Sequence, residues 1–256
     1  MNRRDFITAL GASAATAAFA RPVRSLVGSN GGSYVESAMP TASDYVQDGL
    51  VAMFDGIENA GWGLHDDSVT TPYELVSGQT DAGIRSTFVA NEDNLEVKVS
   101  NISVVTPSVF AGASANAVQD GFLHVEGIFF INALETQIYG NLIGFFGGAF
   151  GWQYRTGQGG LSMLNSGWLL AKDTSTVNAD KVRLAFDVDA ESSTIQYHVG
   201  SQSSPIKSIA VPSSIEPAAY FRNVGTRLYS MRAYNRPLTE DEAAHNRQID
   251  EWRFGL

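Results

Sequence analysis

The sequence lacks cysteine, and charged residues are scarce. With no cysteine in 256 residues, the chain has no disulfide, no thiolate metal ligand, no cysteine nucleophile and no lipid-modified N-terminal cysteine. Charged residues make up only 17% of the chain, and its formal net charge is −10. This excess of negative charge disfavours nucleic acid or an anionic lipid surface as the main partner. A neutral glycan or a protein partner stays open.

Motifs for metal binding and for common catalytic mechanisms are also missing. The chain has only four histidines, and none forms an H-E-x-x-H or H-x-H pattern, so a zinc site is not indicated. There is no G-x-S-x-G nucleophile elbow and no phosphate-binding G-x-x-x-x-G-K loop. His124 and Glu126 lie two residues apart on one face of an expected strand. We interpret them as an exposed pair on the sheet surface.

What the chain has instead is many short apolar runs. Hydrophobic residues make up 44% of the sequence, which holds 25 glycines, and from Tyr45 onward Gly, Asn, Asp and Ser clusters separate the runs. This pattern is typical of antiparallel strands joined by turns. It predicts an all-β fold of two packed antiparallel sheets. The expected strands are Leu50–Asp55, Leu95–Val99, Phe122–Ile131, Leu142–Phe146, Phe150–Arg155, Leu161–Leu164, Lys181–Val188, Thr194–Val199, Ile206–Val211 and Thr226–Tyr234.

One helix is expected, at the C-terminus. Thr239 and Glu242 have the spacing of a capping box, in which each side chain bonds the backbone of the other residue. His245, Ile249 and Trp252 follow at helical spacing and define a face that is expected to pack on the sheet edge.

The N-terminus is expected to be an export signal. Residues 1–20 place Arg3 and Arg4 before an alanine-rich apolar run that ends Ala18-Phe19-Ala20, which is the order of a signal peptide. This segment resembles a twin-arginine leader, although general secretion and an uncleaved anchor stay open. Residues 21–43 are expected to form a flexible linker, and 44–256 a single domain. The protein is therefore expected to be periplasmic, cell-surface or secreted, without a membrane span after leader removal.

Three segments resemble a known family. Residues 227–242 combine an alternating strand, a Tyr-Asn-Arg turn and a Thr-x-x-Glu helix start; Asp48–Gly56 and the pair Val182–Asp189 and Tyr197–Gly200 are looser matches. Together they resemble the laminin G-like domains of bacterial secreted proteins, within the concanavalin A-like superfamily. The resemblance implies a jelly-roll sandwich with a short C-terminal helix, used in glycan recognition or adhesion, sometimes with calcium at a rim loop. Residues 60–120 have no counterpart.

Aromatic side chains are the candidate ligand contacts. A sugar ring stacks on a flat indole or phenol face, so Trp62, Trp152, Tyr154 and Trp168 are considered. Trp152 and Tyr154 alternate with polar residues along one strand, a pattern that core packing also explains. Trp62 and Trp168 lie among Gly, Asn and Ser, and are the preferred exposed platforms.

Two acidic clusters are weaker candidates. Glu58, Asn59, Asp66 and Asp67 supply oxygen ligands for Ca²⁺, but without the regular spacing of a calcium loop, so a solvated turn is favoured; no other cofactor is expected. Asp187, Asp189 and Glu191 alternate as in the catalytic strand of glycanases that share the concanavalin A-like fold. The run ends in an expected turn at residues 192–193, and an exposed acidic turn explains it without catalysis.

The sequence therefore predicts an exported glycan-binding or adhesion module and favours a binder over an enzyme. A glycoside hydrolase of the same fold is one alternative, which depends on whether Asp187, Asp189 and Glu191 line a cleft. A structural or adhesive partner of another cell-surface protein is the other, and it predicts a contiguous exposed apolar patch. Fold resemblance alone does not choose among them.

Overall fold

The structure is a computed structural model, and it describes part of the chain. The described residues are 39–59, 63–64, 73–80, 86–100, 109–130, 140–145, 150–155, 160–163, 181–199, 207–210, 219–220 and 227–256. They lie within one compact unit that spans Met39–Leu256. None of the helices within these ranges is both long and apolar enough to span a membrane.

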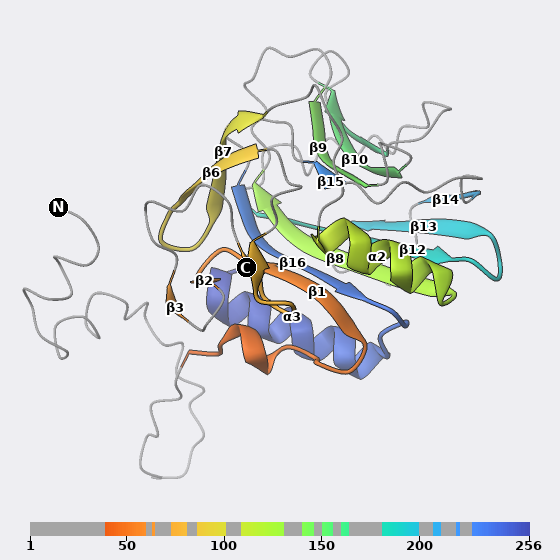
Figure 1. Cartoon of the computed structure of the whole chain (residues 1–256), viewed down its shortest axis with the longest axis horizontal. Coiled ribbons are helices and arrows are strands. Elements are labelled where there is room, and N and C mark those ends of the chain that lie inside the picture. Colours follow the sequence, from red (N-terminus) through yellow and green to blue (C-terminus); the bar gives the residue numbers. More distant parts are fainter. Residues whose placement is uncertain are drawn as a thin grey trace, which may run out of the picture. The chain divides into compact units, whose positions relative to one another are not determined.

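Antiparallel strands dominate the described residues (Figure 1). In chain order the elements are η1 (Ala42–Asp44), β1 (Leu50–Asp55), β2 (Glu58–Asn59), β3 (Gly63–Leu64), β4 (Tyr73–Glu74), β5 (Gln79–Thr80), β6 (Ser86–Ala90), β7 (Leu95–Ser100), α2 (Val109–Gln119), β8 (Phe122–Phe130), β9 (Gly140–Phe145), β10 (Phe150–Arg155), β11 (Gly160–Met163), β12 (Val182–Asp189), β13 (Thr194–Val199), β14 (Lys207–Ala210), β15 (Ala219–Tyr220), β16 (Arg227–Tyr234) and α3 (Glu240–Phe254). Each of the ten expected strands is confirmed, with ends shifted by at most a few residues.

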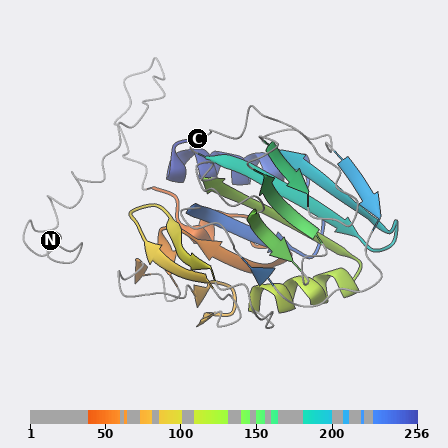
Figure 2. The same cartoon turned by 90° about the horizontal axis from the view of Figure 1, so that it is seen from above.

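Most strands belong to two sheets. The larger has eight strands in the order β14-β13-β12-β8-β16-β7-β6, and β1 also pairs with β16. Strands β1 and β7 share one edge of β16: β7 pairs with Arg227 and Leu228, and β1 with Ser230–Tyr234. The smaller sheet has the order β11-β10-β9-β15. It lies on the side of the large sheet opposite α3 (Figures 1 and 2), an arrangement compatible with the expected sandwich.

One face of the large sheet is apolar. Residues paired across neighbouring strands point to the same face, so alternate positions of β8, β12, β13, β16 and β1 form one continuous layer. Its buried members include Leu123, Val125, Phe129, Leu184, Phe186, Val188, Ile195, Tyr197, Met231, Ala233 and Phe54. This is the burial with a period of two that the sequence predicts.

Helix α2 covers part of this apolar face and was not expected from the sequence. Phe110 stacks on Phe54 with ring centroids 5.5 Å apart. Phe110, Ser114, Ala117 and Val118 are buried, which is the spacing of a helix face. The sequence Val109–Gln119 hides this pattern because its buried positions are mostly small and Gly112, Ser114 and Asn116 resemble turn residues. The expectation of a single helix was therefore wrong.

Helix α3 begins as the sequence predicts but packs through a different face. The capping box is present, because Thr239 Oγ1 accepts from the Glu242 backbone N–H and Glu242 Oε2 accepts from the Thr239 N–H. The expected face of His245, Ile249 and Trp252 is wrong: only Ile249 is buried, and Trp252 is 42% exposed. The buried residues are Asn246, Ile249, Asp250, Arg253 and Phe254, and they lie on the sheet's face, not its edge.

Residues 39–47 pack against the buried side of α3. The Val46 N–H donates to Asn246 Oδ1, and the Pro40 carbonyl accepts from Arg253. Ala42 and Tyr45 are buried in a small cluster with Met53 and Ile249. The compact unit therefore includes residues 39–43, the last part of the segment expected to be a linker.

Candidate functional site

The second face of the large sheet is charged. The same alternation that buries apolar residues on one face places Glu126, Arg183, Asp187 and Arg232 on the other, where α3 lies. Alternating charged residues in a strand normally mark a solvated surface. Here Arg232 has no exposed side-chain surface and Glu126 only 7%, so this face is a buried polar layer.

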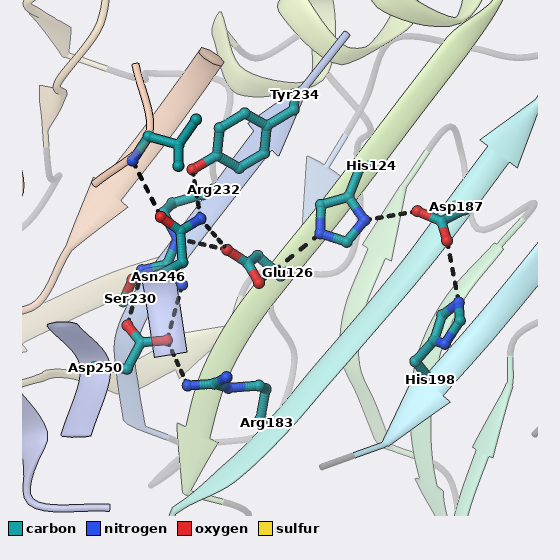
Figure 3. Close-up of polar contacts among 11 residues, drawn as sticks. His124, Glu126, Arg183, Asp187, His198, Ser230, Arg232, Tyr234, Asn246 and Asp250 are labelled. Atoms are coloured by element: carbon teal, nitrogen blue, oxygen red, sulfur yellow. Dashed lines mark hydrogen bonds and ion pairs between the residues drawn. The ribbon is translucent and has the colours of Figure 1, made fainter. Parts of the chain in front are cut away.

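Arg232 is the centre of that layer (Figure 3). Its Nε donates to Glu126 Oε1 at 3.0 Å, and its Nη1 and Nη2 donate to the two oxygens of Asp250 at 2.9 Å each. Arg183 Nη2 reaches the same Asp250 at 2.6 Å. Burial lowers the pKa of Arg232, but the charges of Asp250 and Glu126 outweigh it and raise the pKa well above its ordinary value. The guanidinium therefore stays charged inside the protein.

A second buried arginine joins α3 to β1. Arg253 Nη2 donates to Asp55 Oδ1 and its Nη1 to Glu58 Oε1, both at 2.7 Å. Tyr45 lies between the two arginines, with the Arg232 guanidinium 3.9 Å from its ring centroid and its hydroxyl donating to Asp250 at 2.7 Å. Each buried charge in this layer thus has an oppositely charged or aromatic neighbour, which buried ions require.

Beyond α3 the polar layer continues as a row of two histidines and two carboxylates. His124 Nδ1 lies 2.6 Å from Asp187 Oδ1, and His198 Nε2 lies 3.0 Å from Asp187 Oδ2. On its other side His124 Nε2 is 3.8 Å from Glu126 Oε2. The side chains of His124, Asp187 and His198 are 14%, 22% and 15% exposed, so solvent or a small group reaches this row. It is the candidate functional site within the described residues.

The row stabilises the charged forms of His124 and Asp187. Burial lowers the pKa of His124, but hydrogen bonding and the charges of Asp187 and Glu126 outweigh this and raise it from 6.5 to about 9. Burial raises the pKa of Asp187, but hydrogen bonds from His124 and His198 lower it from 3.8 to about 2. The contact with Glu126 is longer than a hydrogen bond, so Glu126 acts on His124 mainly through its charge. At neutral pH His124 is an imidazolium between two carboxylates.

The three carboxylates considered for catalysis fall in different surroundings. Asp187 lies in the row, with each oxygen held by an imidazole. Asp189 accepts from the backbone N–H groups of Glu191 and Ser192 and from the Ser192 hydroxyl, so it caps the β12–β13 turn. Glu191 is exposed in that turn. Of the three, only Asp187 lies among other ionisable side chains.

The aromatic candidates for ligand binding have no described side chains. Trp62 and Trp168 lie outside the described residues. Trp152 and Tyr154 occupy alternate positions of β10, opposite Met163 and Leu161 of β11, and only their backbone is described. Exposed aromatic platforms therefore stay a sequence-based prediction.

The calcium candidates are placed only in part. Asp66 and Asp67 lie outside the described residues, as does the side chain of Asn59. Glu58 Oε1 accepts from the Ala42 N–H at 2.9 Å and from Arg253 at 2.7 Å. Within the ranges that the structure describes, no group of three or more His, Asp or Glu side chains is arranged to hold a metal ion.

Sequence reasoning missed most of the polar layer. Glu126 was expected to be exposed with His124, but it is buried. Arg232 and Asn246 donate hydrogen bonds to its Oε1. Nothing in the sequence pattern marks Arg183, Arg232 or Asp250 as part of a site. The only signal in the sequence is that Glu126 and Arg232 are charged positions inside otherwise apolar runs, and it does not identify their partners.

The folded chain is thus a mostly antiparallel β protein with a short C-terminal helix. Solved structures with a similar fold include a sialidase of Trypanosoma rangeli, with a TM-score of 0.53, 14% identity and 85% of this chain covered. A mutant of that sialidase displaying trans-sialidase activity has a TM-score of 0.52, 14% identity and 86% coverage. The binding domain of botulinum neurotoxin serotype C1 has a TM-score of 0.51, 9% identity and 80% coverage.

These likenesses concern the fold alone. The chain spans about a third of the sialidase chains, 34% and 35%, and about half of the toxin binding domain, 52%. No family model matches the sequence, and no curated protein does either.

Proposed function

We propose that the protein is an exported carbohydrate-binding or adhesion module with a concanavalin A-like, laminin G-like jelly-roll fold. The observation that carries this proposal is the fold shared over 80–86% of the chain with a sialidase, which is an enzyme of sugar substrates, and with a toxin's binding domain. The closing strand, turn and capped helix at residues 227–242 support the same family, and the leader-like residues 1–20 support export.

Trp62 and Trp168 are the proposed contacts for a sugar ring, with Trp152 and Tyr154 as further candidates. Ca²⁺ is the proposed metal, with Glu58, Asn59, Asp66 and Asp67 as its candidate ligands. The chain's net charge of −10 favours a neutral glycan over a strongly acidic one.

The environment of Asp187 supports binding over glycoside hydrolysis. A retaining hydrolase needs two carboxyl groups about 5–5.5 Å apart, one of them protonated at working pH. Asp187 has both oxygens bonded to imidazoles and a pKa lowered to about 2, so it is a poor proton donor. Glu126, the nearest described carboxylate along the row, also has a lowered pKa and is bonded to Arg232.

A glycan-array screen tests the proposal. The protein without residues 1–20 is applied with and without EDTA, beside Trp168→Ala and the control Trp252→Ala, whose indole lies on the outer side of α3. We expect glycan binding to weaken at least tenfold in Trp168→Ala, which is a loss of about 1.4 kcal/mol or more in binding free energy. Binding by Trp252→Ala is expected to be unchanged. Loss with EDTA supports a metal. Absence of binding to any glycan rejects the proposal and favours a protein partner.

A further inference from the structure

We propose that Glu126, His124, Asp187 and His198 form a proton-held clamp, which ties strands β8, β12 and β13 together while His124 is protonated and weakens when that proton is lost. The proposal concerns the fold's response to pH. It does not depend on the proposed glycan binding.

One carboxylate joins the three strands. Asp187 of β12 is the direct register partner of His124 of β8, and their side chains meet at 2.6 Å. Its second oxygen takes His198 of β13 at 3.0 Å. A proton on His124 therefore strengthens a contact between strands that are far apart in the sequence, and the contact lies on the sheet face beside α3 (Figure 3).

When the His124 ring is neutral, the negative charges of the described groups that face it are not balanced. On its own strand Glu126 lies 3.8 Å from Nε2, and on β12 Asp187 bonds Nδ1. On β16 the Tyr234 ring lies 6.0 Å away and is neutral, since burial raises the pKa of its hydroxyl. On β13 His198 bonds the far oxygen of Asp187. On α3 Asn246, uncharged, bonds Glu126 and Tyr234.

Glu126 connects the row to the helix. Its Oε1 accepts from Arg232 at 3.0 Å and from Asn246 of α3 at 2.9 Å, while its Oε2 faces His124. When His124 is neutral, Arg232 is the one described cation left in contact with Glu126, and the buried His124 Nε2 has no hydrogen-bond partner among the described residues. The proton on His124 therefore also supports the contact between α3 and the sheet.

The direction of the pH effect follows from the raised pKa of His124. A histidine whose pKa rises from 6.5 to about 9 on folding binds its proton more tightly in the native state. Its stabilising effect is complete below pH 6.5, falls as the pH rises, and is lost above about 9. A shift of this size changes the folding equilibrium by two to three powers of ten, roughly, across that window.

The first measurement is a pH titration of the wild-type protein, and variants serve only to assign its histidine resonances. The ring resonances of the four histidines are followed by NMR from pH 5 to 10.5 in the purified protein, and His65→Gln, His198→Gln and His245→Gln assign His124 by exclusion. We expect a midpoint for His124 near 9. A midpoint at or below 6.5 overturns the proposal.

The second measurement separates a clamp from an isolated basic histidine. Urea unfolding of wild type, His124→Gln and the control His245→Gln is compared at pH 6 and pH 9.5. His245 is exposed and bonds only the Asp44 carbonyl among the described residues. Raising the pH is expected to lower the folding equilibrium constant of wild type and of His245→Gln. We expect this decrease to be at least thirtyfold larger than the decrease for His124→Gln. Equal losses in all three proteins contradict the clamp, and if His124→Gln does not fold, the NMR midpoint alone decides.

Discussion

The two faces of the large sheet are built from the same strands, but one buries apolar side chains and the other buries charged side chains. On the face toward α2, alternate residues such as Leu123, Leu184 and Phe54 are apolar and buried. On the face toward α3, the residues between them include Arg232 and Glu126, which are just as buried but charged. The apolar face gains stability from every group removed from water, whereas the charged face is stable only while its partners stay matched. In this sheet a charged strand residue such as Arg232 is therefore as buried as the apolar residues of the opposite face.

The largest loss of stability is expected when the central cation, Arg232, is removed. Arg232→Met leaves Glu126 and Asp250 buried with fewer cations, and we expect a loss of about 4 kcal/mol in the free energy of unfolding. Arg236→Met is the matched control, because Arg236 makes its ion pairs with Asp48 and Glu242 near the surface. We expect that control to lose less than about 1 kcal/mol in urea denaturation. Similar losses in both variants would mean that Arg232 is not the centre of the layer.

The apolar face is expected to respond less steeply to a single truncation. Leu184→Ala removes buried methyl groups from the middle of β12, and we expect a loss of about 3 kcal/mol in thermal or urea unfolding. Arg183→Ala, the neighbouring position on the charged face, tests the other side of the same strand. An unchanged midpoint for Leu184→Ala contradicts the assignment of this face to the core.

An acid titration sharpens the account of the row. The pKa of Asp187 is lowered from 3.8 to about 2 in the folded protein, so its contribution is present above pH 3.8 and is lost as the pH falls toward 2. We expect Asp187→Asn to lose about 2 kcal/mol at pH 6 and to differ little from wild type at pH 2. Glu191→Gln, at an exposed position of the β12–β13 turn, is the control. A wild-type advantage that persists at pH 2 would contradict the assigned role.

The smallest expected effect is at the start of α3. Thr239→Ala removes the side chain that accepts from the Glu242 N–H, and we expect a loss of about 1 kcal/mol. Thr239→Ser keeps the oxygen and is expected to behave as wild type in thermal unfolding. A larger loss than for Leu184→Ala would place the helix start, and not the buried faces, at the centre of stability.

Much of the fold was predictable, because its signals are local. The alternation in Val182–Asp189 and Thr194–Val199 predicts strands, and Thr239 with Glu242 predicts the start of α3. Helix α2 was not predictable in this way, since its buried positions are small and its Gly and Ser residues favour turns. Short pairs such as β2–β3 and β4–β5 contain too few residues for any pattern.

The candidate site was predictable only in fragments. The sequence marks Asp187 and His124 as candidates but gives His198 no role; the three residues come from different strands, and their meeting depends on the register of β8, β12 and β13. Asp250 looks like any acidic residue on an exposed helix until α3 is placed over Arg232. Ion pairs between residues far apart in sequence have no periodic signature, so sequence patterns alone do not reveal them.

A double-mutant cycle between Arg232 and Asp250 measures whether these two charges stabilise α3 on the sheet as a matched pair. Arg232→Met, Asp250→Leu and the double variant are compared with wild type by urea unfolding at pH 6. We expect the double variant to lose less free energy of unfolding than the two single variants lose together, by at least about 2 kcal/mol. Single losses that add to within about 0.5 kcal/mol would contradict the account.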